Sequence, residues 1–488
     1  MLAAFGPCLA GPFVFDDFGL LNDPAIASHS GWRECWRWKQ TRPLTWFSFW
    51  ASYETGDENP AGYHAVSLAL HLGVAALLWD VLRRLIPQRA ALIATGIFAL
   101  HPLAAEPVSY IFARGTLLAA LFSLLAARSW IRDRGGAAAG WFLMAMLAKE
   151  ECAALPVFLL LMDISRGVKL RRGPLGAMFA IALALGLRTV WAAAVTAGSQ
   201  AGAQAGISPA SYLAAEGPVI LGYLRMLVLP WGFSVDYSSV PAPLAWSMAA
   251  WVGVAALAVA ASRRFKGLAM GFWFLGGLVL LAPSSSIFPA TDLANDRRMY
   301  LPLMAFSACA ALLLQRADGR VLLGGAVALA AITAYYTNLW RSPEALWSEA
   351  VRRAPEKVRP RLQLARAVAP RQALEILKQA QQMAPDDAGV AAEQGRILLE
   401  RARPAEALAA FGRALALDPG DARTLNNRGA ALAALGQPEA AEADFERALA
   451  RDACLFDARL NLARMGLRRP APEGCRYTDR QQQMLEAR

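Results

Sequence analysis

Two neighbouring carboxylates are the residues of this chain best suited to chemistry. Asp16 and Asp17 follow directly on the apolar run FVF, so both are expected at the surface of a membrane. A carboxylate held at such a surface can accept the proton of an alcohol that attacks an electrophile. The alternative interpretation is that the pair only caps a helix where a span ends and water solvates it.

Further ionisable residues lie at the ends of several other apolar runs. Ionisable groups beside membrane spans are costly and commonly mark a functional cavity. Each cation alone can be explained as a side chain that snorkels to the headgroups. As a set beside two carboxylates, they favour a site for a lipid phosphate next to a base. The candidate residues are Arg42, His101, Glu106, Arg114, Lys149, Glu150, Arg297 and Arg298.

Charge is distributed unevenly along the 488 residues. Residues 1–340 hold 25 basic and 18 acidic side chains, whereas the much shorter segment 341–488 holds 24 and 20. The contrast predicts a membrane domain over 1–340 and a soluble domain after it. The net charge of +11 is not a sign of nucleic-acid binding, because most cations of the first part form short clusters between apolar runs, as membrane orientation requires.

Apolar runs that approach the length of a bilayer crossing predict an all-α, polytopic membrane domain. A further apolar stretch, 209–231, contains Glu216, Pro218 and Pro230. We expect it to lie on the membrane or re-enter it without crossing. Residues 1–12 are too short for a full span, so the first helix is expected to be truncated. The predicted spans are 61–82, 90–110, 115–130, 137–149, 152–165, 174–196, 244–262, 268–288, 299–315 and 321–340.

The basic clusters orient these spans. Clusters such as Arg83 with Arg84 and Arg263 with Arg264 fall in alternate loops, which places those loops in the cytoplasm. The last span then runs outward, so the C-terminal domain is predicted in the same compartment as the first outer loop. The predicted outer loops are 13–60, 102–114, 197–243 and 289–298.

A period of 34 residues runs through the C-terminal part. Phe411 recurs as Phe445, and Gly395 recurs as Gly429. This period, with small residues at packing positions, is typical of tetratricopeptide repeats. We expect about three repeats over 341–469, the first of them degenerate, stacked into a solenoid with a concave docking face. A tail, 470–488, follows.

The six cysteines lack the spacing of zinc ligands. Cys454 and Cys475 can form a disulfide if the C-terminal domain faces an oxidising compartment. The residue pattern requires no cofactor and indicates no metal, although a divalent ion is compatible with it.

Seven motifs occur in a defined order ahead of the repeats. They are FVFDDF, TRPLTWFSFW, GYHAVSLALHL, FALHPLAAEPVSYIFARGTLLA, LAKEECAALPVFLLLMD, LPWGFSVDYS and DRRMYLPL. Over about residues 13–465 the chain resembles the transmembrane and tetratricopeptide-repeat O-mannosyltransferases and their bacterial relatives, within the C-type glycosyltransferase fold. It departs from them in the short first span, in HPLAAEP without the usual second histidine, and in its few repeats.

The resemblance implies that a sugar, with mannose as one candidate, moves from a polyprenyl-phosphate carrier to a protein hydroxyl on the outer face. It gives Asp16 the role of base, while Asp17 supports it or orients the acceptor. A single displacement inverts the anomeric centre. The other motif matches are Arg297 or Arg298 for the carrier phosphate, Lys149 and Glu150 for the AKE motif, and His101 and Glu106 for the HP…E turn.

Two other classes of function fit parts of the pattern. A membrane-anchored scaffold would use the repeats to recruit envelope or secretory proteins, but it leaves the acidic pair and the outer cations unexplained. A lipid-linked sugar flippase or polymerase would place ionisable residues at mid-membrane depth. The Ala- and Arg-rich composition favours a bacterial inner membrane with periplasmic repeats. In a eukaryote the repeats would lie in the lumen of the endoplasmic reticulum.

Overall fold

The computed structural model describes residues 1–195, 207–238, 243–285 and 288–487. In these ranges the chain is helical, with no β-strand. It divides into two units, the first built from 1–17 and 32–342 and the second from 18–31 and 343–488. The predicted membrane domain ends at 340, two residues before the end of the first unit at 342. The sequence pattern did not indicate that 18–31 belongs with the repeats.

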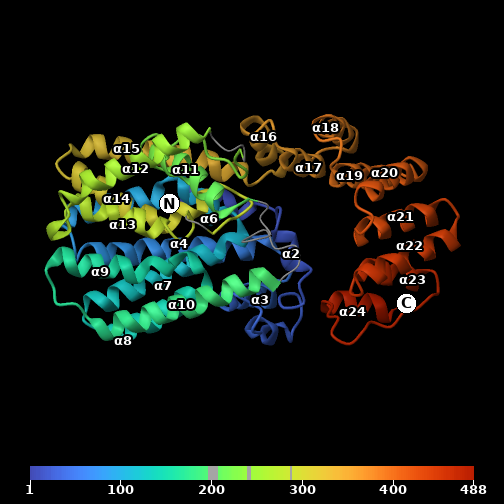
Figure 1. Cartoon of the computed structure of the whole chain (residues 1–488), viewed down its shortest axis with the longest axis horizontal. Helices are drawn as coiled ribbons and strands as arrows, with labels where there is room; N and C mark the ends of the chain where they lie inside the picture. Colours follow the sequence, from blue (N-terminus) through green and yellow to red (C-terminus); the bar gives the residue numbers. More distant parts are fainter. Residues whose placement is uncertain (196–206, 239–242, 286–287, 488) are drawn as a thin grey trace. The chain divides into compact units, whose positions relative to one another are not determined.

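The first unit is a bundle of long apolar helices that share one continuous core (Figure 1). Six of them are long and apolar enough to cross a membrane, which makes this a multi-pass membrane protein. The helices are α1 Leu2–Phe5, α3 Pro43–Gly56, α4 Pro60–Leu82, α5 Gln88–Leu100, α6 Ala105–Ser109, α7 Arg114–Ile131, α8 Gly135–Ala148, α9 Leu155–Arg166, α10 Arg172–Val195, α11 Pro209–Val228, α12 Leu244–Ser262, α13 Met270–Leu281, α14 Tyr300–Leu314 and α15 Gly319–Leu339. Helix α2, Asp17–Leu21, begins at the last residue of this unit's first segment.

Six of the predicted spans match the six long helices, which are 60–82, 111–131, 172–195, 244–262, 296–314 and 319–339. The predicted span 90–110 is instead bent by 54° between α5 and α6, because the chain breaks at Pro102. Helices α8 and α13 are shorter apolar helices, and α9 has 12 residues. Helix α11, in the stretch expected not to cross, is not among the six. Parts of the predicted loop 197–243 and of the span 268–288 lie outside the described residues.

The second unit consists of short helices, each packed against its neighbours in the chain, as the repeats predict. The helices are α16 Pro343–Arg353, α17 Val358–Ala367, α18 Pro370–Met383, α19 Ala388–Glu400, α20 Pro404–Leu417, α21 Ala422–Ala434, α22 Pro438–Arg451, α23 Phe456–Arg464 and α24 Asp479–Glu486. In two successive pairs, α19 with α20 and α21 with α22, a glycine meets a phenylalanine ring. A Cβ on Gly395 would lie 2.5 Å from the ring of Phe411, and one on Gly429 would lie 2.7 Å from that of Phe445, so only glycine fits.

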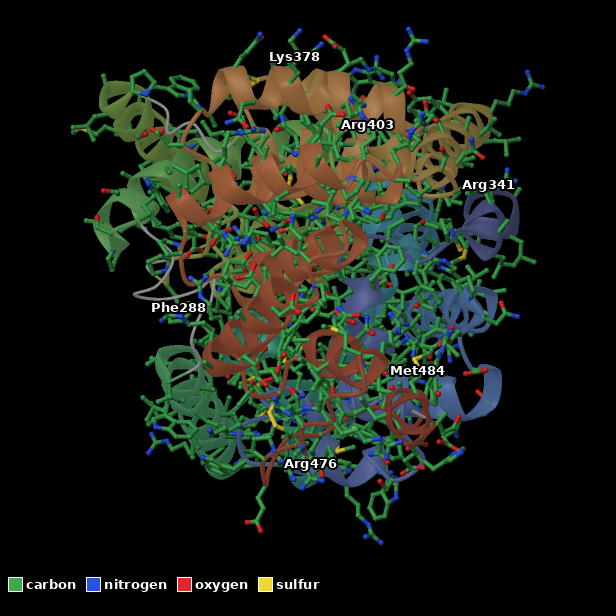
Figure 2. All side chains as sticks on the ribbon, turned by 90° about the vertical axis from the view of Figure 1, so that its right-hand side faces the viewer. Phe288, Arg341, Lys378, Arg403, Arg476 and Met484 are labelled. Carbon is green, nitrogen blue, oxygen red and sulfur yellow. A yellow bond between two sulfur atoms is a disulfide. The ribbon has the colours of Figure 1, made fainter. Side chains whose placement is uncertain are left out.

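The stack has two ends. Figure 2 shows Lys378, on α18, and Arg476, in the segment before α24, at opposite ends of this unit. At the Arg476 end, Cys454 and Cys475 form a disulfide, as the sequence allowed. The tail therefore closes the last repeat instead of trailing from it.

Candidate active site

Asp17 is a buried anchor. Its side chain is fully buried, its Oδ2 accepts a hydrogen bond from the backbone N–H of Val14 at 3.1 Å, and its Oδ1 accepts one from Phe112 at 2.8 Å. Burial raises the pKa of Asp17 to about 8, because the charged form is poorly solvated there. Asp17 therefore ties the acidic pair to the segment before α7.

Asp16 differs from its neighbour by being exposed. The hydroxyl of Tyr110 donates to its Oδ2 at 2.8 Å. The preceding residue, Phe15, has φ +52°, a conformation that is uncommon for a bulky side chain. Strained backbone of this kind is frequent at functional sites. Asp16 is thus held at the surface, exposed and hydrogen-bonded.

Tyr110 links the carboxylate to a cation. Its buried ring stacks on Trp340, with centroids 5.3 Å apart. The guanidinium carbon of Arg297 lies 5.9 Å from the Tyr110 ring centroid. Tyr110 was not predicted as a site residue, because an aromatic residue in an apolar run has the pattern of a core residue. Its position between two candidate residues of the HPLAAEPVSYIFARG motif, Glu106 and Arg114, was the available signal.

A cavity of about 460 Å³ lies in the first unit. Its wall carries four cations, Arg42, Lys149, Arg297 and Arg298, while Met146 and Val190 add apolar surface. The acidic and polar lining includes Glu150, Glu151, Tyr212, Asp292 and Asn295. A cavity with several convergent cations suits an anionic group such as a phosphate.

Helix ends and short loops position two of the cations. The Arg42 Nε donates to Glu150 Oε2 at 3.0 Å, and this guanidinium lowers the pKa of Glu150 to about 2 against the raising effect of burial. Lys149 follows the end of α8, and its Nζ lies 2.7 Å from Glu151 Oε2 and donates to Thr116 Oγ1 at 2.6 Å. The cations are therefore fixed in place before any ligand binds.

The other two cations begin the segment that leads into α14. Arg297 forms an ion pair with Glu106, which is only 4% exposed, and its backbone N–H donates to the same carboxylate at 3.0 Å. Arg298 donates to the carbonyl oxygen of Leu293 at 2.7 Å and contacts Glu216 at 3.3 Å. Glu216 was not among the predicted site residues, since a single carboxylate in a Pro-containing stretch indicates little by itself.

Three of the predicted phosphate-site residues do not line this cavity. Glu106 is one of them, and it reaches the cavity only through its ion pair with Arg297; His101 and Arg114 are the other two. His101 is buried, and its Nδ1 accepts the backbone N–H of Leu103, which caps the short helix after α5. Arg114 is fully buried and joins α7 to α3 and α4. It donates to the oxygen atoms of Ser48 and Ser52, both at 2.8 Å, and to the carbonyl of Tyr63 at 3.0 Å. Both residues therefore hold helices together in this structure. In the described ranges, no group of three or more His, Cys, Asp or Glu residues could hold a metal ion.

Known proteins match parts of this chain. The tetratricopeptide-repeat family model matches residues 410–443. The human protein O-mannosyl-transferase TMTC4 is 30% identical over 193 residues, which are 31% of this chain and 26% of the relative. The chain is similar to the protein O-mannosyl-transferases. The Caenorhabditis elegans protein O-mannosyl-transferase F38B6.6 is 32% identical over 146 residues, or 26% of this chain and 21% of that relative. The matches thus span about a quarter of the relatives' length.

Solved structures resemble the chain only distantly. ArnT from Cupriavidus metallidurans, bound to undecaprenyl phosphate, is 16% identical with a TM-score of 0.40, covering 91% of this chain and 78% of that one. MamA is 18% identical with a TM-score of 0.23, covering 29% of this chain and 82% of its own.

Proposed function

We propose that this protein transfers a sugar from a polyprenyl-phosphate carrier to a hydroxyl group of an acceptor protein. The observation that supports this most directly is the arrangement of an exposed, hydrogen-bonded carboxylate, Asp16, joined through Tyr110 and Arg297 to a cavity walled by cations. The sequence similarity to protein O-mannosyl-transferases makes mannose the first sugar to test.

The cavity would receive the carrier phosphate. Arg42, Lys149, Arg297 and Arg298 line it, and fixed cations stabilise charge that develops on a leaving phosphate. The bond between the anomeric carbon and the phosphate oxygen breaks, and the carrier phosphate keeps the electron pair. No strong general acid is needed, because the leaving group is already an anion.

Asp16 would act at the other end of the displacement. The acceptor hydroxyl attacks the anomeric carbon from the face opposite the phosphate, and its proton passes to the Asp16 carboxylate as the new bond forms. The Tyr110 hydroxyl orients that carboxylate through its hydrogen bond to Oδ2. One displacement inverts the configuration, so a product with retained configuration would contradict this mechanism.

The chemistry would take place on the outer side of the membrane. The basic loops alternate with the loops that carry the site, and the Cys454–Cys475 disulfide fits an oxidising compartment. The repeats would then share that compartment and could present acceptor chains, because a solenoid offers an extended concave surface.

The experiment is a transfer assay with the purified full-length protein in vesicles that contain polyprenyl-phosphate mannose, with envelope proteins as acceptors. Mass spectrometry detects the hexose on the acceptor. Asp16→Asn is expected to lower the rate about 10²- to 10⁴-fold, the usual contribution of a general base. Asp133→Asn makes the same change at a side chain that is 88% exposed and should leave the rate unchanged.

The same assay separates the rival functions. A scaffold that only recruits envelope proteins would yield no transferred sugar from the parent protein. A flippase would move the labelled carrier between leaflets without forming glycoprotein. Full transfer by a folded Asp16→Asn variant would overturn the role given to this carboxylate.

A further inference from the structure

The segment that follows the acidic pair belongs to the repeat unit. Residues 18–31 are grouped with 343–488, although more than three hundred residues separate them in sequence. The segment folds back on itself: the N–H groups of Ile26 and Ala27 both donate to the carbonyl of Asp23 at 2.9 Å. A Cβ on Gly31 would lie 2.7 Å from the carbonyls of Pro24 and Ala25. Residues 18–31 therefore form a compact loop, and at Gly31 the backbone packs too closely for any other residue.

The first turn of α24 binds this loop. The backbone N–H of Asp479 donates to the carbonyl of Ala27 at 3.2 Å. Its carboxylate accepts the backbone N–H of His29 at 2.9 Å. A capping box between Thr478 and Gln481 fixes the start of α24 and so fixes the position of Asp479.

The residues before α24 are fastened to the last repeat. The Cys454–Cys475 disulfide links the start of α23 to the tail. The guanidinium of Arg459, which is 5% exposed, donates to the hydroxyl of Tyr477 at 2.9 Å and to the carbonyl of Pro470 at 2.7 Å. The tail is therefore a rigid connection from the repeats to the loop, which we call the strap and define as residues 468–486.

We propose that the strap holds the segment 18–31 and so helps to position Asp16, which lies two residues before it, with Asp479 as the positioning residue. This inference rests on the proposed function. Helix α2 runs from Asp17 to Leu21, so the chain passes from the acidic pair directly into the segment that the strap holds. A small displacement of a catalytic group can cost about 10²-fold in rate. Holding 18–31 in one conformation would limit the backbone movement of α2, the helix that directly follows Asp16.

The first test compares Asp479→Ala with Asp479→Asn in the transfer assay. Asp479→Ala removes the acceptor for the His29 N–H and should lower kcat about 10- to 100-fold, with the KM for the carrier unchanged. The asparagine variant keeps a side-chain oxygen at this position and should restore kcat to within about threefold of the parent. Asp386→Ala, an exposed aspartate elsewhere in the repeat unit, is the matched control and should match the parent.

A second measurement does not depend on activity. Hydrogen exchange of the amides in 18–31 should become faster in Asp479→Ala and in the double variant Cys454→Ser/Cys475→Ser, while α19 to α22 stay protected. A kcat unchanged in Asp479→Ala would overturn the strap's role. So would an equal loss in Asp386→Ala, or unchanged exchange in 18–31. A parent protein that transfers no sugar would instead overturn the proposed function, and exchange would still report on the contact.

Discussion

Substitution by asparagine should have different effects at the two carboxylates of the acidic pair: at Asp17 it should lower the stability of the fold, and at Asp16 it should lower the rate of sugar transfer. Asp17→Asn changes a side chain that is fully buried and accepts two backbone N–H groups, from Val14 and Phe112. Asparagine has one oxygen, so one of these donors loses its acceptor, at a cost of about 1–3 kcal/mol. Asp16→Asn keeps an oxygen for the Tyr110 hydroxyl and should change the free energy of unfolding by less than about 1 kcal/mol.

The effect of Asp17→Asn should depend on pH. Burial raises the pKa of Asp17 to about 8 in the folded protein, whereas an unfolded aspartate titrates near 3.9. Between these values the unfolded state has lost the proton that the folded state keeps. The parent therefore loses up to about 1.4 kcal/mol of stability per pH unit as the pH rises. Asparagine does not titrate, so the stability of the variant rises relative to that of the parent as the pH increases across this range.

The assay is thermal unfolding of the parent and both variants in detergent between pH 5 and pH 8. The melting temperature of Asp17→Asn, relative to the parent, should rise steadily with pH. Its transfer rate should stay within about tenfold of the parent at the pH where both are folded, while Asp16→Asn loses far more activity. A melting-temperature difference that stays constant from pH 5 to pH 8 would show that the Asp17 carboxylate is ionised throughout, and would refute this reasoning.

Three further outcomes follow from other parts of the chain. Arg42→Gln leaves Glu150 without its ion pair, and the KM for the carrier should rise at least about tenfold, measured from initial rates; an unchanged KM would remove Arg42 from the phosphate site. Gly395→Ala should destabilise the repeats by about 1–3 kcal/mol, because its Cβ meets the Phe411 ring. Gly412→Ala has open space and should stabilise them by about 0.5–1 kcal/mol, so equal melting shifts would contradict the packing argument. A cysteine placed at Ala430 should react with an impermeant maleimide only from the outer side, and labelling from the cytosol would reverse the proposed orientation.

The sequence predicted well what depends on local pattern. The apolar runs located the long helices. The 34-residue period located the repeats, because the contact of a glycine with a phenylalanine recurs in two successive helix pairs. Five of the predicted ionisable residues line one cavity: Arg42, Lys149, Glu150, Arg297 and Arg298. These residues lie at helix ends, in loops that the predicted spans place on the outer side of the membrane. Their residue types and their positions relative to the spans were therefore enough to predict that they lie together.

What the sequence could not supply was contact between distant segments. Arg114 looks like the other cations in sequence, yet its donors face carbonyl oxygens of α3 and α4, and only the packing of those helices shows this. The hydrogen bond between His29 and Asp479 joins residues 450 positions apart, and nothing in either stretch indicates the other. Tyr110 was missed for a similar reason, because a buried aromatic side chain and a site residue have the same local pattern.

The ion pairs between the cavity's cations and carboxylates affect how a product would be released from the cavity. Arg42, Lys149 and Arg297 each have a carboxylate neighbour, in Glu150, Glu151 and Glu106. Under the proposed function, an arriving carrier phosphate would share these cations with carboxylates. Its binding before the reaction would then be moderate, and the spent carrier would diffuse back into the bilayer. Turnover in such a pocket depends as much on release as on capture.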